Sequence, residues 1–407
     1  MKSLLIRNIK SLVGIRDRSI HMIRGAEMKT LPSIGNAYLL VEDGLIKSYG
    51  ENSEAPEHAD EVIDATGKFV LPCWCDPHTH LVYAGSREEE FVHRINGMTY
   101  EAIASKGGGI HNSAKLLAAS SEEELFDTAW QRLEDIKQMG TGAVEIKSGY
   151  GLSPEGEMKM LRVIRKLKEK SPLAIKATFL GAHTYPVEYR NNCESYLQLL
   201  IQKVIPVIAS EGLADFIDVF CEMDFFNVEE TDRILEAGVK YGLRPKVHVN
   251  QFSIIGGVEV SVAHNALSVD HLELVSEEDI ALLQQSSTMP TALPGCSFFL
   301  NLPYTPARRM MDAGLPLAIA SDFNPGSSPS GNMNLVLSLA CLKMNMLPEE
   351  AVNAATLNSA YAMDVEGQMG SITVGKKAHV FITKPIPSLA YLPYSFGSNL
   401  IDRVIIS

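Results

Sequence analysis

The chain has 407 residues, enough for one large domain with a smaller one, or for two domains of medium size. Hydrophobic residues make up 46% of it, which supplies a sizeable core, and a formal net charge of −13 argues against a nucleic-acid partner. No apolar run approaches the ~18 residues of a membrane span, and the six cysteines are few for this length, so we expect a cytoplasmic protein with reduced thiols and no membrane partner.

Short β-rich segments lie near both ends of the chain. Residues 37–50 contain two of them around an Asp-Gly turn, which is typical of a β-hairpin. Residues 370–383 and 398–407 have the same character. We therefore expect a small β-sandwich domain assembled from both termini, from residues 1–68 and 360–407.

Between these segments, strand-like and helical runs alternate. Eight strands are expected, at residues 69–80, 142–149, 174–183, 216–222, 244–250, 266–272, 287–295 and 317–324. Helices are expected between some of them at 121–140, 155–170 and 228–242. This alternation predicts an α/β fold, a (β/α)8 TIM-like barrel over residues 69–359. A doubly wound open sheet is the alternative, but no G-x-G-x-x-G motif follows the first strand.

Polar residues stand where these strands end, which is where barrels carry their active sites. His78 and His80 end the first strand, His248 the fifth, His271 the sixth and Asp322 the eighth. Side chains alternate along a strand, so His78 and His80 point the same way, and two neutral imidazoles on one face can share a metal ion. We predict a metal site with His78, His80, His248 and Asp322 as ligands and one position left for water.

A histidine taken alone does not indicate a metal. A single buried histidine is usually a core residue, and an H-x-H pair often arises by chance; the recurrence at several strand ends favours the metal site. Two more residues lie near strand ends. Glu222 is the better candidate for a bridging ligand, whereas Lys147 is expected to be a solvated or pocket-wall amine rather than a carbamylated bridge. Whether either contacts the metal stays open.

Longer motifs resemble the imidazolonepropionase family of amidohydrolases over about residues 35 to 385. They are "DPHTHLVYAGSREEEF", "GGGI", "EIKSGYGL", "TFLGAH", "DFIDVFCE", "VDHLE", "ALPG" and "SDFNPGSSPS". The histidines and the aspartate indicate only the amidohydrolase superfamily. The motifs "HLVYAGSRE", "KSGYGL" and "DFNPGSSP" are the ones that resemble the imidazolonepropionase family in particular. The resemblance implies a (β/α)8 barrel with a terminal β-sandwich, one zinc or iron ion per subunit on the four predicted ligands, and a homodimer.

The resemblance also implies a reaction. The family opens the cyclic amide of 4-imidazolone-5-propanoate with water to give N-formimidoyl-L-glutamate, the third step of histidine degradation. Asp322 would then transfer the proton of the attacking water, and His271 would stabilise the charge on the carbonyl oxygen. Arg87 presents a planar fork suited to the substrate carboxylate. The other residues implied to line the substrate pocket are Tyr150, His183, Gln251, Asn324, Gly326 and Ser327, with the backbone amides of the last two available to an anion.

One position departs from the family pattern. Many members carry Glu three residues after the histidine of the fifth strand, where this chain has Gln251. An amide can bond to the imidazolone ring but cannot transfer a proton at neutral pH. We expect Gln251 to orient the ring, and the sequence does not decide how Asp322 and His271 share the proton transfer.

Two alternative functions are compatible with these residues. A nucleobase deaminase or a dihydropyrimidinase-like enzyme would use the same metal ligands, but a deaminase has no need of Arg87 and the "NPGSS" loop to hold a propionate. A non-catalytic binding or assembly module would be expected to lack some of the ligands, and all four are present. The sequence does not distinguish zinc from iron, nor does it fix the oligomeric state.

Overall fold

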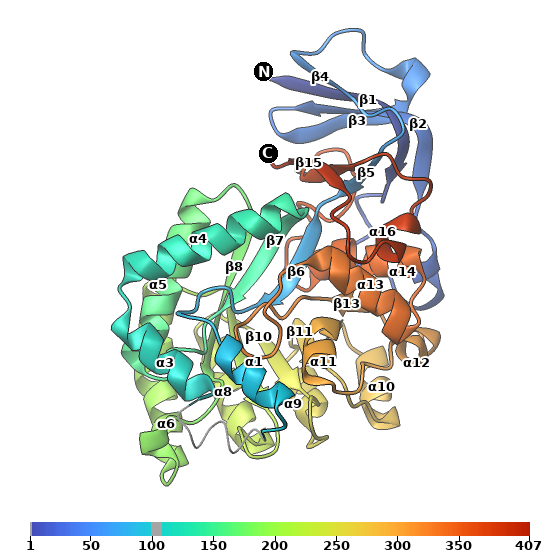
Figure 1. Ribbon diagram of the computed structural model, residues 1–407. Coiled ribbons are helices and arrows are strands. Elements are labelled where there is room, and N and C mark those ends of the chain that lie inside the picture. Colours follow the sequence, from blue (N-terminus) through green and yellow to red (C-terminus); the bar gives the residue numbers. More distant parts are fainter. Residues whose placement is uncertain (1, 99–107) are drawn as a thin grey trace.

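The computed structural model describes residues 2–98 and 108–407, and Gly107 of the "GGGI" motif lies outside them. Eight parallel strands form one sheet in the order β13-β12-β11-β10-β9-β8-β7-β6 (Figure 1). They are β6 (Trp74–Thr79), β7 (Thr141–Lys147), β8 (Ala174–Ala182), β9 (Phe216–Cys221), β10 (Arg244–Val249), β11 (Ser268–His271), β12 (Met289–Ala292) and β13 (Ala318–Ile319). All eight expected strands are present, and the predicted barrel is confirmed.

The barrel closes where the chain leaves β13 and runs beside β6. Thr79 and Phe323 form a parallel bridge, and the amide of His80 donates to the carbonyl of Phe323 at 2.9 Å. The amide of Asp322 donates in turn to the carbonyl of His78 at 3.0 Å. This backbone pairing sets the two histidines of the first strand directly beside Asp322.

Helices lie between the strands and cover the outside of the barrel (Figure 1). The three expected helices are confirmed as α4 (Glu122–Gln138), α5 (Pro154–Lys170) and α8 (Val228–Lys240). α4 begins at a capping box, in which Ser121 and Glu124 each bond the backbone amide of the other. The remaining helices are α1 (Glu88–Ile95), α3 (Ile110–Ala119), α6 (Cys193–Leu199), α7 (Ile205–Ser210), α9 (Gly257–Ala263), α10 (Glu277–Gln284), α11 (Pro294–Leu300), α12 (Ala307–Asp312), α13 (Met333–Met344), α14 (Pro348–Asn353), α15 (Ser359–Tyr361) and α16 (Tyr391–Tyr394), with short 3₁₀ or π segments at Gly25–Lys29, Asn52–Glu54, Val187–Tyr189, Leu200–Val204 and Ala354–Asn358.

The two ends of the chain form a second sheet of seven strands beyond one end of the barrel (Figure 1). Its strands are β1 (Ser3–Val13), β2 (Ser33–Glu42), β3 (Leu45–Glu51), β4 (Glu61–Asp64), β5 (Phe69–Pro72), β14 (Val380–Thr383) and β15 (Ile401–Ile405). The β2–β3 turn is the expected Asp-Gly pair, and Asp43 and Gly44 both have positive φ, as a tight hairpin turn requires. β4 and β5 pair with opposite ends of β1, and the sheet has its own core, which includes Ile6, Leu39 and Val380.

The expected strand at 69–80 is divided between the two sheets. Residues 69–72 form β5, which pairs with β1 and β14, whereas residues 74–79 form β6 of the barrel. Strand pairing therefore changes at Cys73, four residues after the expected boundary. The division into a barrel of residues 69–359 and a terminal domain of residues 1–68 and 360–407 stays a prediction.

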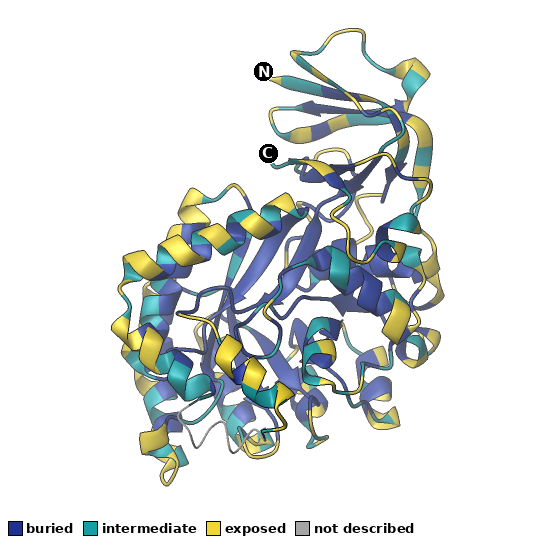
Figure 2. Cartoon of the chain, viewed as in Figure 1, coloured by how far each residue is buried: buried dark blue, intermediate teal, exposed yellow. Residues whose placement is uncertain are grey.

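Burial follows these layers. Figure 2 shows the barrel strands buried and the exposed residues gathered on the outer faces of helices such as α4 and α5. The largest buried hydrophobic cluster joins the barrel strands to the inner faces of these helices. Within the described residues, no helix is both long enough and apolar enough to cross a membrane.

Candidate active site

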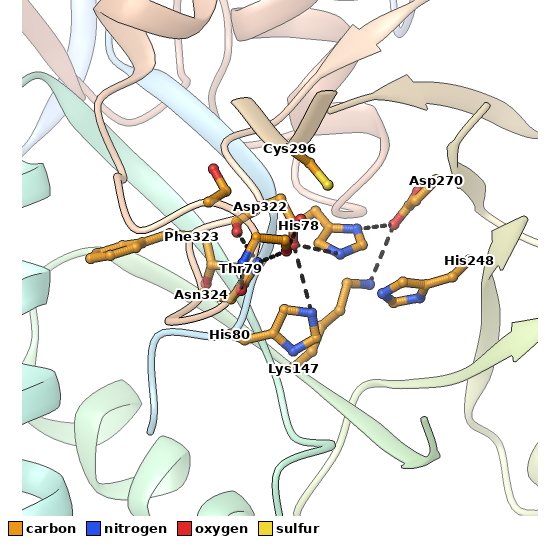
Figure 3. A network of polar contacts seen from close by, with 12 residues as sticks. His78, Thr79, His80, Lys147, His248, Asp270, Cys296, Asp322, Phe323 and Asn324 are labelled. Atoms are coloured by element: carbon orange, nitrogen blue, oxygen red, sulfur yellow. Dashed lines mark hydrogen bonds and ion pairs between the residues drawn. The ribbon is translucent and has the colours of Figure 1, made fainter. Parts of the chain in front are cut away.

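Residues from distant strands meet at the carboxyl end of the barrel. His78, His248 and His271 form one group of potential metal ligands, and His78, His80 and Asp322 form another, each with ligand atoms within 4.8 Å of one another. The Nε2 atoms of His78 and His80 lie 3.5 and 3.9 Å from Oδ1 of Asp322. All five side chains are buried. Figure 3 shows the four predicted ligands close together, with His78 and His80 from the end of β6, His248 from β10 and Asp322 from the segment after β13.

Two imidazole nitrogens in this cluster have no hydrogen-bond partner among the described residues. Nε2 of His78 and Nε2 of His248 are buried and make no hydrogen bond. Their Nδ1 atoms are held by carboxylates, His78 by Asp270 at 2.7 Å and His248 by Asp218 at 3.0 Å. A carboxylate acceptor fixes the hydrogen on Nδ1 and directs the Nε2 lone pair inward. A buried unpaired nitrogen is costly, and a metal ion would compensate it, so these residues fit the implied metal.

Burial also sets the charge of these histidines. It lowers the pKa of His78, His80 and His248 well below the usual value, and nearby cationic groups lower it further. The rings are therefore neutral at neutral pH, the form that binds a metal. Burial acts on the carboxyl group in the opposite direction and raises the pKa of Asp322 to about 6.

The pKa of His271 is shifted in the opposite direction to that of the neighbouring histidines. Burial alone would lower its pKa, but the carboxylate of Glu273, with Nδ1 of His271 3.3 Å from its Oε1, raises it. The backbone of His271 has a φ of 89°, unusual outside glycine, and its carbonyl accepts a hydrogen bond from Thr305 at 2.8 Å. The imidazole of His271 is thus held in a fixed position beside the candidate metal ligands, next to a carboxylate that favours its protonated form.

Lys147 is not the solvated amine that the sequence suggested. It is fully buried, and its ammonium lies 2.7 Å from Glu145, 2.8 Å from Asp218 and 3.4 Å from Asp270. Figure 3 shows the last of these contacts. Burial alone would lower the pKa of Lys147, but these carboxylates raise it. Carbamylation would replace this cation with a further anion among three carboxylates, which the surroundings disfavour.

Glu222 belongs to a loop rather than to the metal cluster. One oxygen of its carboxylate accepts the backbone amides of Gln251 and Phe252 at 3.0 and 2.9 Å. The other accepts the amide of Met223 at 3.1 Å and the hydroxyl of Ser253. Glu222 is absent from every candidate ligand group found among the described residues, so its contacts favour a structural role over a bridging one.

The residues expected to line the substrate pocket surround this cluster. The ring of His183 stacks on that of His80 with centroids 5.4 Å apart, and Tyr150 packs edge-on against both. Gln251 lies on the other side and donates from Nε2 to Sγ of Cys296 at 3.4 Å. Cys296 in turn lies within 4.8 Å of ligand atoms of His271 and Glu273.

The loop after Asp322 differs from the expectation in one respect. The backbone amides of Gly326 and Ser327, expected to be available to an anion, both donate to Oδ1 of Asn324 at 2.8 Å. Such Asx turns are common in loops that contain Asn and Gly. The hydroxyl of Ser327 remains directed at the carboxylate of Asp322, at 3.3 Å. In this structure the loop therefore offers side chains to the pocket, and its two amides are engaged.

Arg87 reaches the same loop from α1. A Cβ atom at Gly326 would lie 2.2 Å from Nη1 of Arg87, so a glycine is needed for this close approach. The Nε and Nη2 atoms of Arg87 donate to Glu90 at 2.9 and 2.6 Å, and Arg94 donates to the carbonyl of Gly326 at 3.0 Å. The N-cap residue of α1, Arg87, and Arg94 within the helix thus both contact the loop that follows Asp322.

Comparison with known proteins gives the family. A model described as "Amidohydrolase family" matches residues 230–407. The chain is 59% identical to the imidazolonepropionase of Flavobacterium johnsoniae, over 99% of this chain and 98% of the relative. It is 41% identical to the imidazolonepropionase of Brevibacillus brevis, over 99% and 96% of the two chains. The chain belongs to the imidazolonepropionase family.

Solved structures share the fold at low sequence identity. An adenosine deaminase from Xanthomonas campestris with bound zinc covers 100% of this chain and 92% of its own, with a TM-score of 0.70 and 15% identity. A guanine deaminase from C. acetobutylicum covers 100% and 99%, with a TM-score of 0.70 and 16% identity. Because the close relatives are imidazolonepropionases, the predicted family and the hydrolase class are confirmed, ahead of the deaminase and the non-catalytic alternatives.

Sequence reasoning missed the residues that surround the metal cluster. Asp218, Asp270, Glu273 and Cys296 were not predicted, although each contacts or adjoins a predicted residue. Asp218 and Asp270 are polar residues inside otherwise apolar strands. A charged residue within a buried strand was the available signal, because it must have a partner.

The ligand assignment predicts the metal content of four variants. Replacing any one of His78, His80, His248 or Asp322 by Ala should reduce bound metal and turnover to background while leaving the circular dichroism spectrum unchanged, because a ligand is lost without a change in the barrel core. Metal per subunit would be measured by elemental analysis. His264→Ala is the control, since His264 pairs with Asp232 away from the site. Wild-type metal content in any of the four variants would remove that residue from the ligand set.

Proposed function

We propose that this chain hydrolyses the ring amide of 4-imidazolone-5-propanoate, a small-molecule substrate, to N-formimidoyl-L-glutamate. The observation that supports it most directly is the pair of buried, unpartnered Nε2 atoms on His78 and His248 beside Asp322, in a member of the imidazolonepropionase family. His78, His80, His248 and Asp322 would hold one zinc or iron ion. When bound, that ion supplies Lewis acidity, which makes water acidic enough to ionise near neutral pH.

Asp322 and His271 carry the charge changes of the reaction in this proposal. Asp322 accepts the proton of the attacking water and passes it to the leaving ring nitrogen, and burial raises the pKa of its carboxyl group to about 6. His271 donates to the carbonyl oxygen as it gains negative charge. The carboxylate of Glu273 supports this role because it favours the protonated imidazole.

The remaining residues orient the substrate. Gln251 bonds to the imidazolone ring, and Tyr150 and His183 form the wall against which the ring packs. The substrate carboxylate pairs with Arg87. Glu90 engages the Nε–Nη2 edge of Arg87, and Nη1 lies next to Gly326. A homodimer in the cytoplasm completes the proposal, and light scattering of the purified protein tests the dimer.

Substrate choice and metal dependence can be measured together. The purified protein would be incubated with 4-imidazolone-5-propanoate, adenine, guanine and cytosine, each with and without a chelator. We expect turnover of the imidazolone alone, loss of turnover with the chelator, and recovery when zinc or iron is returned. Turnover of a nucleobase, or undiminished turnover after verified removal of all metal, would refute the proposed function.

The role proposed for Arg87 predicts a specific kinetic effect. Arg87→Lys keeps the charge but loses the planar fork, so it should mainly raise KM; loss of a charge-assisted hydrogen bond of roughly 1.5–3 kcal/mol corresponds to about a 10- to 100-fold change. Gly326→Ala should raise KM too, because the added Cβ displaces Arg87. Gly367→Ala is the matched control, since a Cβ there meets no atom within 4 Å. Unchanged KM in both Arg87→Lys and Arg87→Ala would remove Arg87 from substrate binding.

The role proposed for Gln251 predicts different results for three variants. Gln251→Ala should lose roughly 1–3 kcal/mol in kcat/KM, because polar groups in the pocket lose a partner. Gln251→Glu should stay active but add an ionisation to the pH–rate profile, because a second carboxyl group near Asp322 has a raised pKa. His271→Ala should lose far more than Gln251→Ala. Equal losses in His271→Ala and Gln251→Ala, with metal retained, would contradict this division of roles.

A further inference from the structure

Beneath the candidate metal ligands lies a group of charged side chains that is closed to solvent. Three carboxylates and two ammonium groups meet inside the barrel, and each of these side chains is at most 1% exposed. They are Glu145, Lys147, Asp218, Lys246 and Asp270. Buried charges are stable only when paired, so this arrangement must be geometrically specific.

The contacts of Lys147 set it apart within this group. Asp218 uses one oxygen for Nδ1 of His248 at 3.0 Å and the other for Lys147 at 2.8 Å. Asp270 uses Oδ2 for both Nδ1 of His78, at 2.7 Å, and Lys147, at 3.4 Å. A single ammonium therefore bridges the two carboxylates that hold the Nδ1 atoms of His78 and His248. Figure 3 shows the half of this bridge that runs from Lys147 through Asp270 to His78.

The position and the charge of Lys147 both act on the carboxylates of Asp218 and Asp270. Asp218 and Asp270 must stay anionic and correctly placed to hold the hydrogen on each Nδ1 and the lone pair on each Nε2. Two carboxylates this close repel each other, and the shared cation offsets that repulsion while fixing their separation. A neutral side chain at this position would remove the cation that contacts both anions and would leave their separation less firmly fixed.

We propose that Lys147 is a positioning residue of the metal centre: by bridging Asp218 and Asp270, it aims the Nε2 atoms of His78 and His248 at one common ion. Lys147 does not touch the ion or the substrate in this proposal. The inference rests on the proposed metal site. It makes Lys147, which contacts the carboxylates behind the histidine ligands, a residue that affects metal affinity.

The chain supplies its own matched control in Lys246. This residue is equally buried and also pairs with Glu145, and its other contacts are the backbone carbonyls of Pro77 and Ala362 at 3.1 and 2.9 Å. Lys246 lowers the pKa of Asp270 electrostatically, but among the described residues it makes no hydrogen bond or ion pair with Asp218 or Asp270, the two carboxylates that hold histidines. Loss of a buried ammonium is common to Lys147→Met and Lys246→Met, whereas loss of the bridge is confined to Lys147→Met.

The experiment measures metal binding rather than activity. Zinc would be titrated into metal-stripped wild type, Lys147→Met and Lys246→Met in competition with a chelator of known affinity, and the cobalt(II)-loaded forms compared by visible absorption. We expect Lys147→Met to bind zinc roughly 10- to 100-fold more weakly than Lys246→Met and to have altered cobalt bands. Equal affinities and equal spectra in the two variants would overturn the role of Lys147, whereas a wild type that binds no metal would overturn the proposed function itself.

A double-mutant comparison separates positioning from general destabilisation. Asp218→Asn removes the charge that Lys147 pairs with, so Lys147→Met should weaken zinc binding much less in that background than in the wild type. Full additivity of the two losses would contradict the proposal. If Lys147→Met does not fold, Lys147→Gln replaces it, because Gln keeps a donor of smaller size but cannot supply the bridging charge; wild-type zinc affinity in folded Lys147→Gln would also overturn the proposal.

Discussion

The backbone pairing between β6 and the segment after β13 is the contact on which the rest of the candidate site depends. It joins the first and last strands of the barrel, and its two hydrogen bonds involve the backbones of His78 and Asp322 and of their neighbours His80 and Phe323. A register shift of one residue would turn these side chains to the opposite face. The same backbone pairing therefore closes the barrel and brings His78 and His80 next to Asp322, although these residues are far apart in the sequence.

Burial then gives the site its chemical character. Removing the histidines from water keeps them neutral, while the same environment raises the pKa of Asp322 and requires every nearby charge to have a partner. The fold satisfies that requirement with paired carboxylates and lysines beneath the cluster, whereas the Nε2 atoms of His78 and His248 have no hydrogen-bond partner in the described part of the chain. A metal ion bound to these two Nε2 atoms would compensate for the hydrogen bonds that they lack.

The sequence predicts the parts of this architecture that depend on local patterns. Eight apolar runs become strands and capped helices follow them, because periodicity and end signals are local properties. It cannot predict which polar residues meet inside the barrel: Lys147 and Asp218 lie on β7 and β9, which are not adjacent in the sheet, so their contact depends on the curvature of the barrel. The sequence also does not predict that the backbone amides of Gly326 and Ser327 donate to the side chain of Asn324. An asparagine in such a loop can bond either to the backbone of its own loop or to a ligand, and the local pattern is the same in both cases.

The amide at Gln251 is consistent with its surroundings in a way that a carboxylate would not be. Burial raises the pKa of the Cys296 thiol well above its usual value, with further contributions from Asp322 and Glu273, so the sulfur is a neutral acceptor for the Nε2 hydrogen of Gln251. A carboxylate at position 251 would have no hydrogen to donate there and would add a charge close to Asp322 and Glu273. Gln251 and Cys296 are thus matched as donor and acceptor. That match leaves Asp322 and His271 as the groups of this cluster suited to handle the proton, and it explains how the pocket tolerates an amide where many family members carry an acid.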